Sequence, residues 1–414
     1  MKKTGLITAI SIVITNMIGT GILTTPGVLS SYLSDGRQIL LVWLLAGGIA
    51  LLGVIVYAQM GSLMPHSGGE FYYLSRIYHP CLGKIAGWIS IIVGFAGPIA
   101  LSALAFSEYV ANFSFFQSIF QNTFISISMK KIIALLLIFS LSIFHIYKRK
   151  TVLRFQVIIT VILIAFLLLI SYLSLRFDNT MNAAVFKQSS QFGSNNLGMA
   201  LLIAIYSYTG YNASCYFAGE LYNPKRNLHL SLFIGVFIVM TLYLVVNYCL
   251  LRVLGVSGLS GQIDFLSILG YKLNGQTGSF LISATVIVIL IASTNSMIYT
   301  GSNIPLLNSK VIKTKKGKLD KSNMYLLQLL IACLFVIFTE FQQLIIFLTL
   351  ILTFFSILTA LGVFLLPWKR IRVAPLQKII VKTAAGLLLI VLVWLSVNSI
   401  VTISYNLLLK INKL

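Results

Sequence analysis

Acidic residues are scarce in this sequence, which holds 8 Asp and Glu in 414 residues against 30 Lys and Arg. Charged residues of both signs make up only 9% of the chain, whereas 58% of the residues are hydrophobic. Soluble domains carry about 25% charged residues, so this composition excludes an ordinary soluble domain. We therefore expect an integral membrane protein.

Cysteine and histidine are also few, with four of each. The cysteines lie on different apolar runs without paired spacing, which excludes a disulfide framework and a zinc motif. The histidines lie far apart in the sequence, so we expect no metal site. The sequence contains no Ser/His/Asp arrangement and no phosphate-binding motif. We accordingly expect no cofactor, no catalytic residue and no enzymatic activity.

Long apolar runs dominate the chain, and most have the ~20 residues that a helix needs to cross about 30 Å of hydrocarbon. A basic turn, Tyr147–Arg154, is expected between the fourth and fifth spans. Glu70–Tyr78 is expected at the membrane interface, as an amphipathic or a re-entrant piece. A short twelfth helix within Ser396–Leu409 is an alternative to eleven spans. The eleven predicted spans cover roughly residues 6–29, 38–63, 83–110, 131–147, 153–175, 196–219, 228–251, 279–304, 324–340, 343–367 and 379–397.

The formal net charge of +22 does not require nucleic acid as a partner. If the N-terminus is cytoplasmic, most Lys and Arg residues fall in cytoplasmic loops, as the positive-inside rule demands. Those loops would face anionic membrane lipid. We therefore expect a multi-pass protein of the cytoplasmic (inner) membrane, in which Lys2 and Lys3 precede an uncleaved first span.

One stretch of the first span is unlike an ordinary membrane helix: Asn16–Pro26 reads N-M-I-G-T-G-I-L-T-T-P. Glycine and proline weaken the helical hydrogen-bond ladder, so the helix is expected to break here. Broken backbone in hydrocarbon is tolerated where it lines a cavity, which makes the break a candidate binding site for a carboxylate. The alternative is that these residues are packing notches or kinks.

The sixth span repeats this feature. Ala204–Asn227 places Ser, Thr, Gly and Asn at mid-depth, where polar groups are costly unless they face a cavity or each other. The first half, from the first broken span up to the second, contains five spans, and because five is odd the two halves must have opposite orientations. This is the pattern of a secondary transporter with inverted repeats. We predict a first five-helix repeat (1–176), an outside loop (177–195), an inverted repeat (196–367) and one or more C-terminal helices outside the repeat (368–414).

Three motifs carry a resemblance to a known family: I-G-T-G-I followed by Pro26, and the long stretches Gly47–Leu74 and Tyr206–Asn227. On these residues the chain resembles the amino acid–polyamine–organocation (APC) superfamily, most closely its bacterial amino acid permeases and exchangers. The resemblance covers about residues 4–367. It implies an all-α integral membrane protein of the LeuT type, with five plus five inverted helices and discontinuous helices 1 and 6.

The resemblance also implies a substrate site. In it, backbone N–H groups of the first break meet the substrate carboxylate, and carbonyl groups of both breaks accept hydrogen bonds from its ammonium group. An aromatic residue of helix 6 closes over the substrate, and a glycine allows the second break. Carried over by position, the N–H groups of Gly19, Thr20 and Gly21 would meet the carboxylate. The carbonyls of Met17 or Ile18 and of Tyr206 or Ser207 would meet the ammonium group, Tyr206 is the closing aromatic residue and Gly210 allows the second break. The full set of substrate-binding residues is Met17, Ile18, Gly19, Thr20, Gly21, Tyr206, Ser207, Tyr208, Gly210 and Asn212.

Several positions depart from the family pattern. Gln59 and Asn212 stand where members carry Glu, and Leu163 stands where related exchangers carry a coupling lysine. The coupling ion, Na⁺ or H⁺, is therefore open. Ser293 and Thr294 are candidates for a cation site with helix 1 carbonyls; the alternative is that their hydroxyls bond back to their own helix.

These observations favour one function. We expect a secondary transporter of small amino acids, working by alternating access as an exchanger or permease. Neutral substrates are favoured because no acid or base is expected in the pocket, and burying an unpaired charge would cost several kcal/mol. The alternative is a sensor on the same fold that binds amino acids without transporting them.

Overall fold

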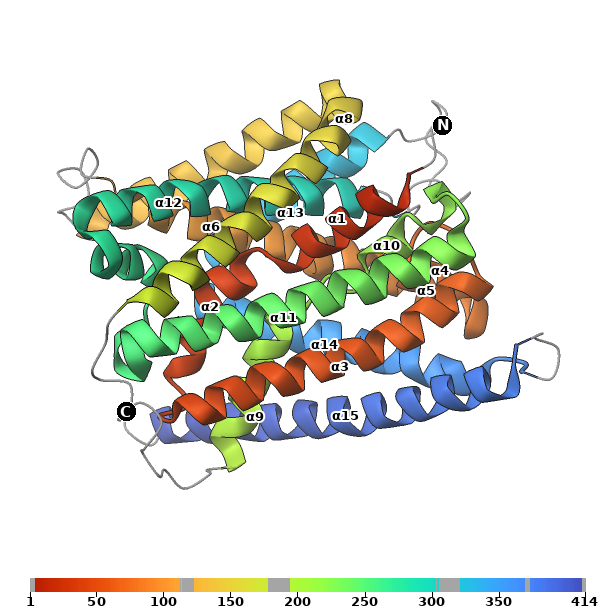
Figure 1. The fold of residues 1–414 in the computed structure, drawn as a ribbon. Helices are drawn as coiled ribbons and strands as arrows, with labels where there is room; N and C mark the ends of the chain where they lie inside the picture. Colours follow the sequence, from red (N-terminus) through yellow and green to blue (C-terminus); the bar gives the residue numbers. More distant parts are fainter. Residues whose placement is uncertain are drawn as a thin grey trace.

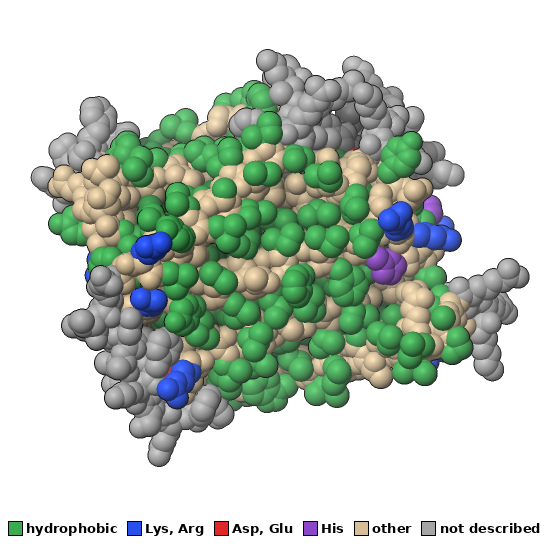
Figure 2. All heavy atoms as spheres, viewed as in Figure 1, with side chains coloured by type: hydrophobic (Ala, Val, Ile, Leu, Met, Phe, Trp, Pro, Cys, Tyr) green, Lys and Arg blue, Asp and Glu red, His purple; other side chains and the backbone are tan. Residues whose placement is uncertain are grey.

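The computed structural model describes residues 4–111, 113, 123–177, 194–302, 304, 321–368 and 373–411. Within these residues the chain is helical, with no strand beyond one isolated bridge between Thr4 and Leu221. In the described residues, nine helical segments are long and apolar enough to cross a membrane. Some of them join consecutive helices, such as Leu6–Ser30 and Pro80–Ala111. Two shorter apolar helices, Leu197–Ser207 and Met324–Phe338, accompany them. Hydrophobic side chains cover the visible flank of the bundle in Figure 2, while Lys and Arg lie toward its two ends. The chain is a multi-pass membrane protein.

The first half of the chain begins with a broken helix and ends with a long one. The apolar parts of this last helix, Ile127–His145 and Val157–Arg176, form two arms in Figure 1. The basic turn expected at 147–154 does not interrupt the helix, because helical backbone continues through these residues. The helices are α1 (Leu6–Met17), α2 (Thr20–Ser30), α3 (Gly36–Leu63), α4 (Glu70–Ile77), α5 (Pro80–Ile89), the π-helix η1 (Ser90–Ala96), α6 (Gly97–Ala111) and α8 (Thr123–Arg176).

The second half also begins with a broken helix. Its last helix is continuous through Ile411, so a separate twelfth helix within 396–409 is wrong. The physical reason is that this stretch contains no glycine or proline to end the helix. The helices are α9 (Ser194–Ser207), α10 (Ala213–Tyr216), the 3₁₀ turn η4 (Ala218–Glu220), α11 (Pro224–Leu259), α12 (Phe265–Gly301), α13 (Lys321–Phe338), α14 (Phe341–Leu365) and α15 (Pro375–Ile411).

Both breaks expected from the sequence are present. Between α1 and α2, Ile18 turns to an extended conformation with ψ of 96°. Between α9 and α10 the helix is interrupted by turn residues 208–212, where Gly210 has φ of +95°. In Figure 1, α1 and α2 run across the bundle in the direction opposite to α9 and α10. The two discontinuous helices are therefore antiparallel.

The surrounding helices bury the first break and the start of the second. Every residue from Ser11 to Ser30 is buried, as are Tyr206, Ser207 and Tyr208. On the outside of this core, α15 is attached to α3 by a hydrogen bond of 2.8 Å from the Gln377 amide to Gln59. Gln59, one of the departures from the family pattern, thus contacts the helix that follows the proposed repeats.

Candidate functional site

Glycines allow the two breaks to touch. A Cβ atom built on Gly21 would lie 2.6 Å from Cα of Ser207, and one built on Gly210 would lie 2.8 Å from the carbonyl oxygen of Asn16. Real Cβ atoms do not approach backbone this closely, and the positive φ of Gly210 disfavours any other residue. The first break therefore packs directly against the second, and Gly21 has a packing role there.

Tyr243 of α11 connects the breaks on one side. Its hydroxyl oxygen lies 2.7 Å from the carbonyl oxygen of Met17 and 3.0 Å from that of Ser207. The rings of Trp43 and Tyr208 pack against the Tyr243 ring at centroid distances of 5.3 and 5.0 Å. Sequence reasoning missed Tyr243, although a tyrosine within the apolar run of a predicted span was a signal, since a buried hydroxyl needs a partner.

Asn16 connects the first break to α12. Its side-chain amide lies 2.7 Å from the hydroxyl of Ser296 and 3.2 Å from that of Thr300. Thr15 reaches the same Ser296 hydroxyl at 3.1 Å. These contacts hold the end of α1 against α12, and the sequence analysis did not include them.

The predicted carboxylate-binding residues lie together at the start of α2. The Thr20 hydroxyl is 3.2 Å from the hydroxyl of Tyr206, so the two predicted residues meet across the breaks. A Cβ atom on Gly19 would lie 2.2 Å from Oγ of Ser293. The hydroxyls of Ser207 and Ser293 are fully buried and have no hydrogen-bond partner among the described residues. Buried hydroxyls are ordinarily paired, so these two unpaired groups at the breaks stand out.

The predicted ammonium acceptors differ in how they are used. The carbonyls of Met17 and Ser207 face Tyr243. The Tyr206 carbonyl accepts from the N–H of Thr209 at 2.9 Å and from its hydroxyl at 2.6 Å. Among the described backbone contacts none uses the carbonyl of Ile18. Ile18 is thus the predicted acceptor without a partner among the described backbone hydrogen bonds.

Ser293 and Thr294 do not point to the same place. Ser293 lies against Gly19 in the first break. The Thr294 hydroxyl lies 2.9 Å from that of Ser102 on α6 and 2.8 Å from the Leu290 carbonyl of its own helix. Only the first member of the predicted cation pair contacts the break, and the second bonds back as the alternative reading expected.

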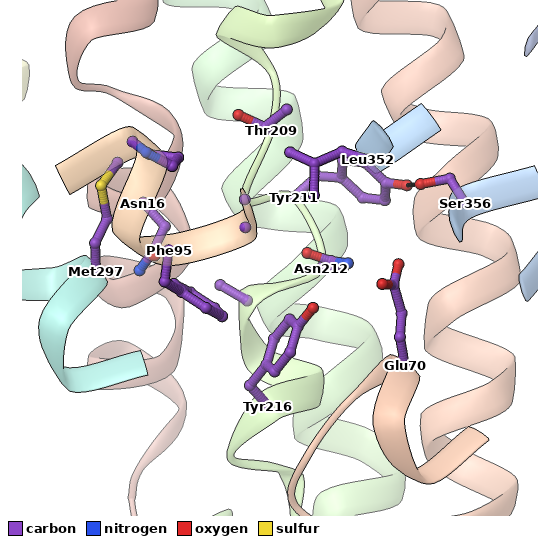
Figure 3. A pocket seen from close by; sticks show the side chains of 14 residues that line it. Asn16, Glu70, Phe95, Thr209, Tyr211, Asn212, Tyr216, Met297, Leu352 and Ser356 are labelled. Atoms are coloured by element: carbon purple, nitrogen blue, oxygen red, sulfur yellow. Dashed lines mark hydrogen bonds between the residues drawn. The ribbon is translucent and has the colours of Figure 1, made fainter. Parts of the chain in front are cut away.

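A cavity of about 60 Å³ lies beside the breaks. A cavity needs roughly 10–15 Å³ to hold one water, so this space is large enough to admit water. Of the predicted residues, Gly210 and Asn212 line it, whereas Tyr208 lines an adjoining cavity of about 40 Å³ and donates to the Trp43 carbonyl at 3.1 Å. Side chains that Figure 3 places around the larger cavity include Asn16, Glu70, Tyr211, Asn212, Tyr216 and Ser356.

Glu70 is the principal surprise of the site. It begins α4, which is too short to span the membrane, yet its side chain is only 4% exposed and its carboxylate accepts a hydrogen bond from Tyr57. Burial raises the pKa of Glu70 to about 7, although the Tyr57 hydroxyl opposes the shift. The expectation that the pocket holds no acid is wrong. An acid between two glycines and a run of aromatic residues, in a sequence with so few acids, was the available signal.

Comparison with known proteins supports the family. Residues 5–409 match the family described as amino acid permease. The chain is 28% identical to the serine/threonine exchanger SteT of Bacillus subtilis over 72% of this chain and 66% of that protein. It is 26% identical to the mouse Asc-type amino acid transporter 1 over 73% of this chain and 57% of the relative. It is 30% identical to the human b(0,+)-type amino acid transporter 1 over 59% of this chain and 50% of the relative.

The chain spans about half to two thirds of the length of these relatives. The family match, in contrast, runs through nearly the whole of this sequence. It includes both broken helices and the cavity between them. On that match, the chain belongs to the amino acid permease family.

Proposed function

We propose that this chain is a secondary transporter that moves small neutral amino acids across the cytoplasmic membrane by alternating access. The observation that carries the proposal is the contact between two antiparallel broken helices, with unpartnered buried hydroxyls of Ser207 and Ser293 at the point of contact. Broken helices meeting in the middle of a bundle supply N–H groups for an anion and carbonyls for a cation. A zwitterionic amino acid needs both.

Within this proposal the substrate carboxylate binds the N–H groups of Gly19, Thr20 and Gly21. The ammonium group binds the Ile18 carbonyl, which no described backbone contact occupies. The side chain points to the cavity beside Asn212. A cavity of about 60 Å³ favours a small side chain.

The repeats follow from the same breaks. We propose that α1 to α8 form the first five-span unit (1–176) and α9 to α14 the inverted second unit (196–367), with α15 outside both. The opposite directions of the two broken helices support this assignment. Eleven spans then place the N-terminus in the cytoplasm and the C-terminus outside, in agreement with the positive-inside rule.

The relatives help to choose among modes of action. SteT is named as an exchanger of serine and threonine, and the other two are named as amino acid transporters. They give the sensor alternative no support, and none is named as an enzyme. We therefore favour exchange of small neutral amino acids.

The test is counterflow in proteoliposomes. Vesicles loaded with unlabelled L-serine or L-alanine are diluted into labelled amino acid, and uptake is compared with that of empty vesicles. We expect uptake that depends on internal amino acid. Saturable binding of label to the purified protein without any accumulation would instead favour the sensor.

Ser293→Ala tests the hydroxyl at the first break. We expect about tenfold weaker amino acid binding, the loss of roughly one hydrogen bond to a charged group, and loss of any stimulation by Na⁺. The matched control is Ser283→Ala, because Ser283 is also buried and unpartnered on α12 but lies ten residues away, about 15 Å along the helix. Equal effects of the two substitutions on binding would contradict a ligand role for Ser293.

A further inference from the structure

The side chain of Glu70 lines the candidate substrate cavity, although Glu70 belongs to α4 and not to either of the two broken helices. The chain enters α4 through hydrogen bonds from the N–H groups of Gly68 and Gly69 to the carbonyls of Tyr216 and Cys215, which join α4 to α10. Figure 3 shows the carboxylate pointing from α4 toward Asn212 and Ser356. α4 is thus coupled to the second broken helix, and its acid lines the same space as that helix.

The groups around this carboxylate are phenols, hydroxyls and a thiol. They come from α3 (Tyr57), from the second broken helix (Tyr211, Cys215 and Tyr216) and from α4 itself (Tyr73). The facing helix α14 contributes Ser356 and has no titratable residue. α5 carries Lys84 and α4 carries Arg76, but neither forms an ion pair with Glu70 in the described part of the chain. Glu70 therefore has no described cation to neutralise it.

A buried carboxylate without a cation is stable when it is protonated, and the cost of ionising it depends on the water around it. The cavity of about 60 Å³ is large enough to admit water. A neutral amino acid that enters the cavity displaces that water without supplying a counter-charge. Amino acid binding must then favour the protonated carboxyl, and by linkage protonation must favour amino acid binding.

We propose that Glu70 is a proton-binding site coupled to the amino acid site, so that the chain takes up a proton when it binds a neutral amino acid. The inference rests on the proposed function and adds the coupling ion to it. The sign follows from the folded-state pKa of about 7, which binding raises further. Affinity is then constant in acid and falls by up to about tenfold per pH unit above that pKa, the limit for one linked proton.

The experiment is isothermal titration calorimetry of the purified protein with L-serine and L-alanine at pH 7.5, in buffers that differ in ionisation enthalpy. The slope of binding enthalpy against buffer ionisation enthalpy gives the number of protons exchanged. We expect the wild type to take up a fraction of one proton and Glu70→Gln to take up none, whatever its affinity. Glu70→Asp should recover part of the uptake, whereas Glu108→Gln, in the ion pair with Lys130, should leave it unchanged.

A second variant keeps the proposal testable if Glu70→Gln does not fold. The Tyr57 hydroxyl stabilises the ionised carboxylate, so Tyr57→Phe should raise the pKa of Glu70 and move the fall in affinity to higher pH. An unmoved profile in this variant would contradict the proposal.

Other outcomes distinguish a failure of the proton-coupling proposal from a failure of the proposed transport function. Binding by the wild type with zero proton exchange, or uptake that persists in Glu70→Gln, overturns the inference and leaves the proposed function intact. Proton release on binding L-ornithine, with affinity lost in Glu70→Gln, would show that the carboxylate pairs with a substrate cation and would also overturn the inference. Absence of binding and counterflow with any amino acid overturns the proposed function itself.

Discussion

Gly21→Val is expected to reduce amino acid affinity by roughly 100-fold, corresponding to about 3 kcal/mol of overpacking. The first added carbon would lie 2.6 Å from Cα of Ser207, which is backbone and cannot rotate away. The two breaks must therefore move apart. The N–H and carbonyl groups that would bind the zwitterion then no longer point toward the same binding site. Radioligand binding to the purified protein measures the effect, and Gly21→Ala should give a smaller loss in the same direction.

A matched glycine controls for the substitution itself. A Cβ atom on Gly48 of α3 meets no atom within 4 Å, so Gly48→Val should leave affinity and unfolding temperature near those of the wild type. Gel filtration and the unfolding temperature establish whether Gly21→Val is folded. Wild-type affinity in a folded Gly21→Val protein would show that amino acid binding does not depend on the contact between the breaks.

Tyr243→Phe is expected to slow counterflow about tenfold and to lower the unfolding temperature. The substitution keeps the ring against Trp43 but removes the hydroxyl that lies within 3.0 Å of both break carbonyls. Losing one buried hydrogen bond costs about 1–3 kcal/mol when acceptors are left unpaired. Tyr243 acts through the carbonyls and is a positioning residue, so we expect the transport rate to change more than the affinity.

The control for this variant is Tyr271→Phe, because the Tyr271 side chain of α12 is 60% exposed. It removes the same atom from a surface position and should change neither rate nor stability. If Tyr243→Phe lowered the unfolding temperature without slowing counterflow, the hydroxyl would have a structural role only. The two breaks would then keep their relative positions without it.

Parts of the site could be predicted because they depend on local chain chemistry. Gly19 and Gly210 weaken the helical hydrogen-bond ladder whatever their tertiary surroundings, so both breaks were predictable at the correct residues. Other parts depend on distant partners. Asn16 contacts Ser296 across 280 positions, and Tyr243 contacts Met17 across 226, separations that no local pattern encodes.

The cation pair illustrates the same limit within one helix. Ser293 and Thr294 are adjacent in sequence, but neighbouring residues on a helix point about 100° apart. One hydroxyl therefore reaches the first break while the other bonds to α6 and to its own helix. Residue type alone could not separate their roles.

The sequence by itself determined that this protein is a helical membrane protein with two broken helices, because long apolar runs and backbone-breaking residues act locally. Only the tertiary structure decided that Glu70 is buried in the cavity. Its position in the sequence, after two glycines and at the start of a short helix, is also compatible with a solvated surface acid. The hydrogen bonds that join α4 to α10 turn it inward, and burial without a cation then sets its chemistry.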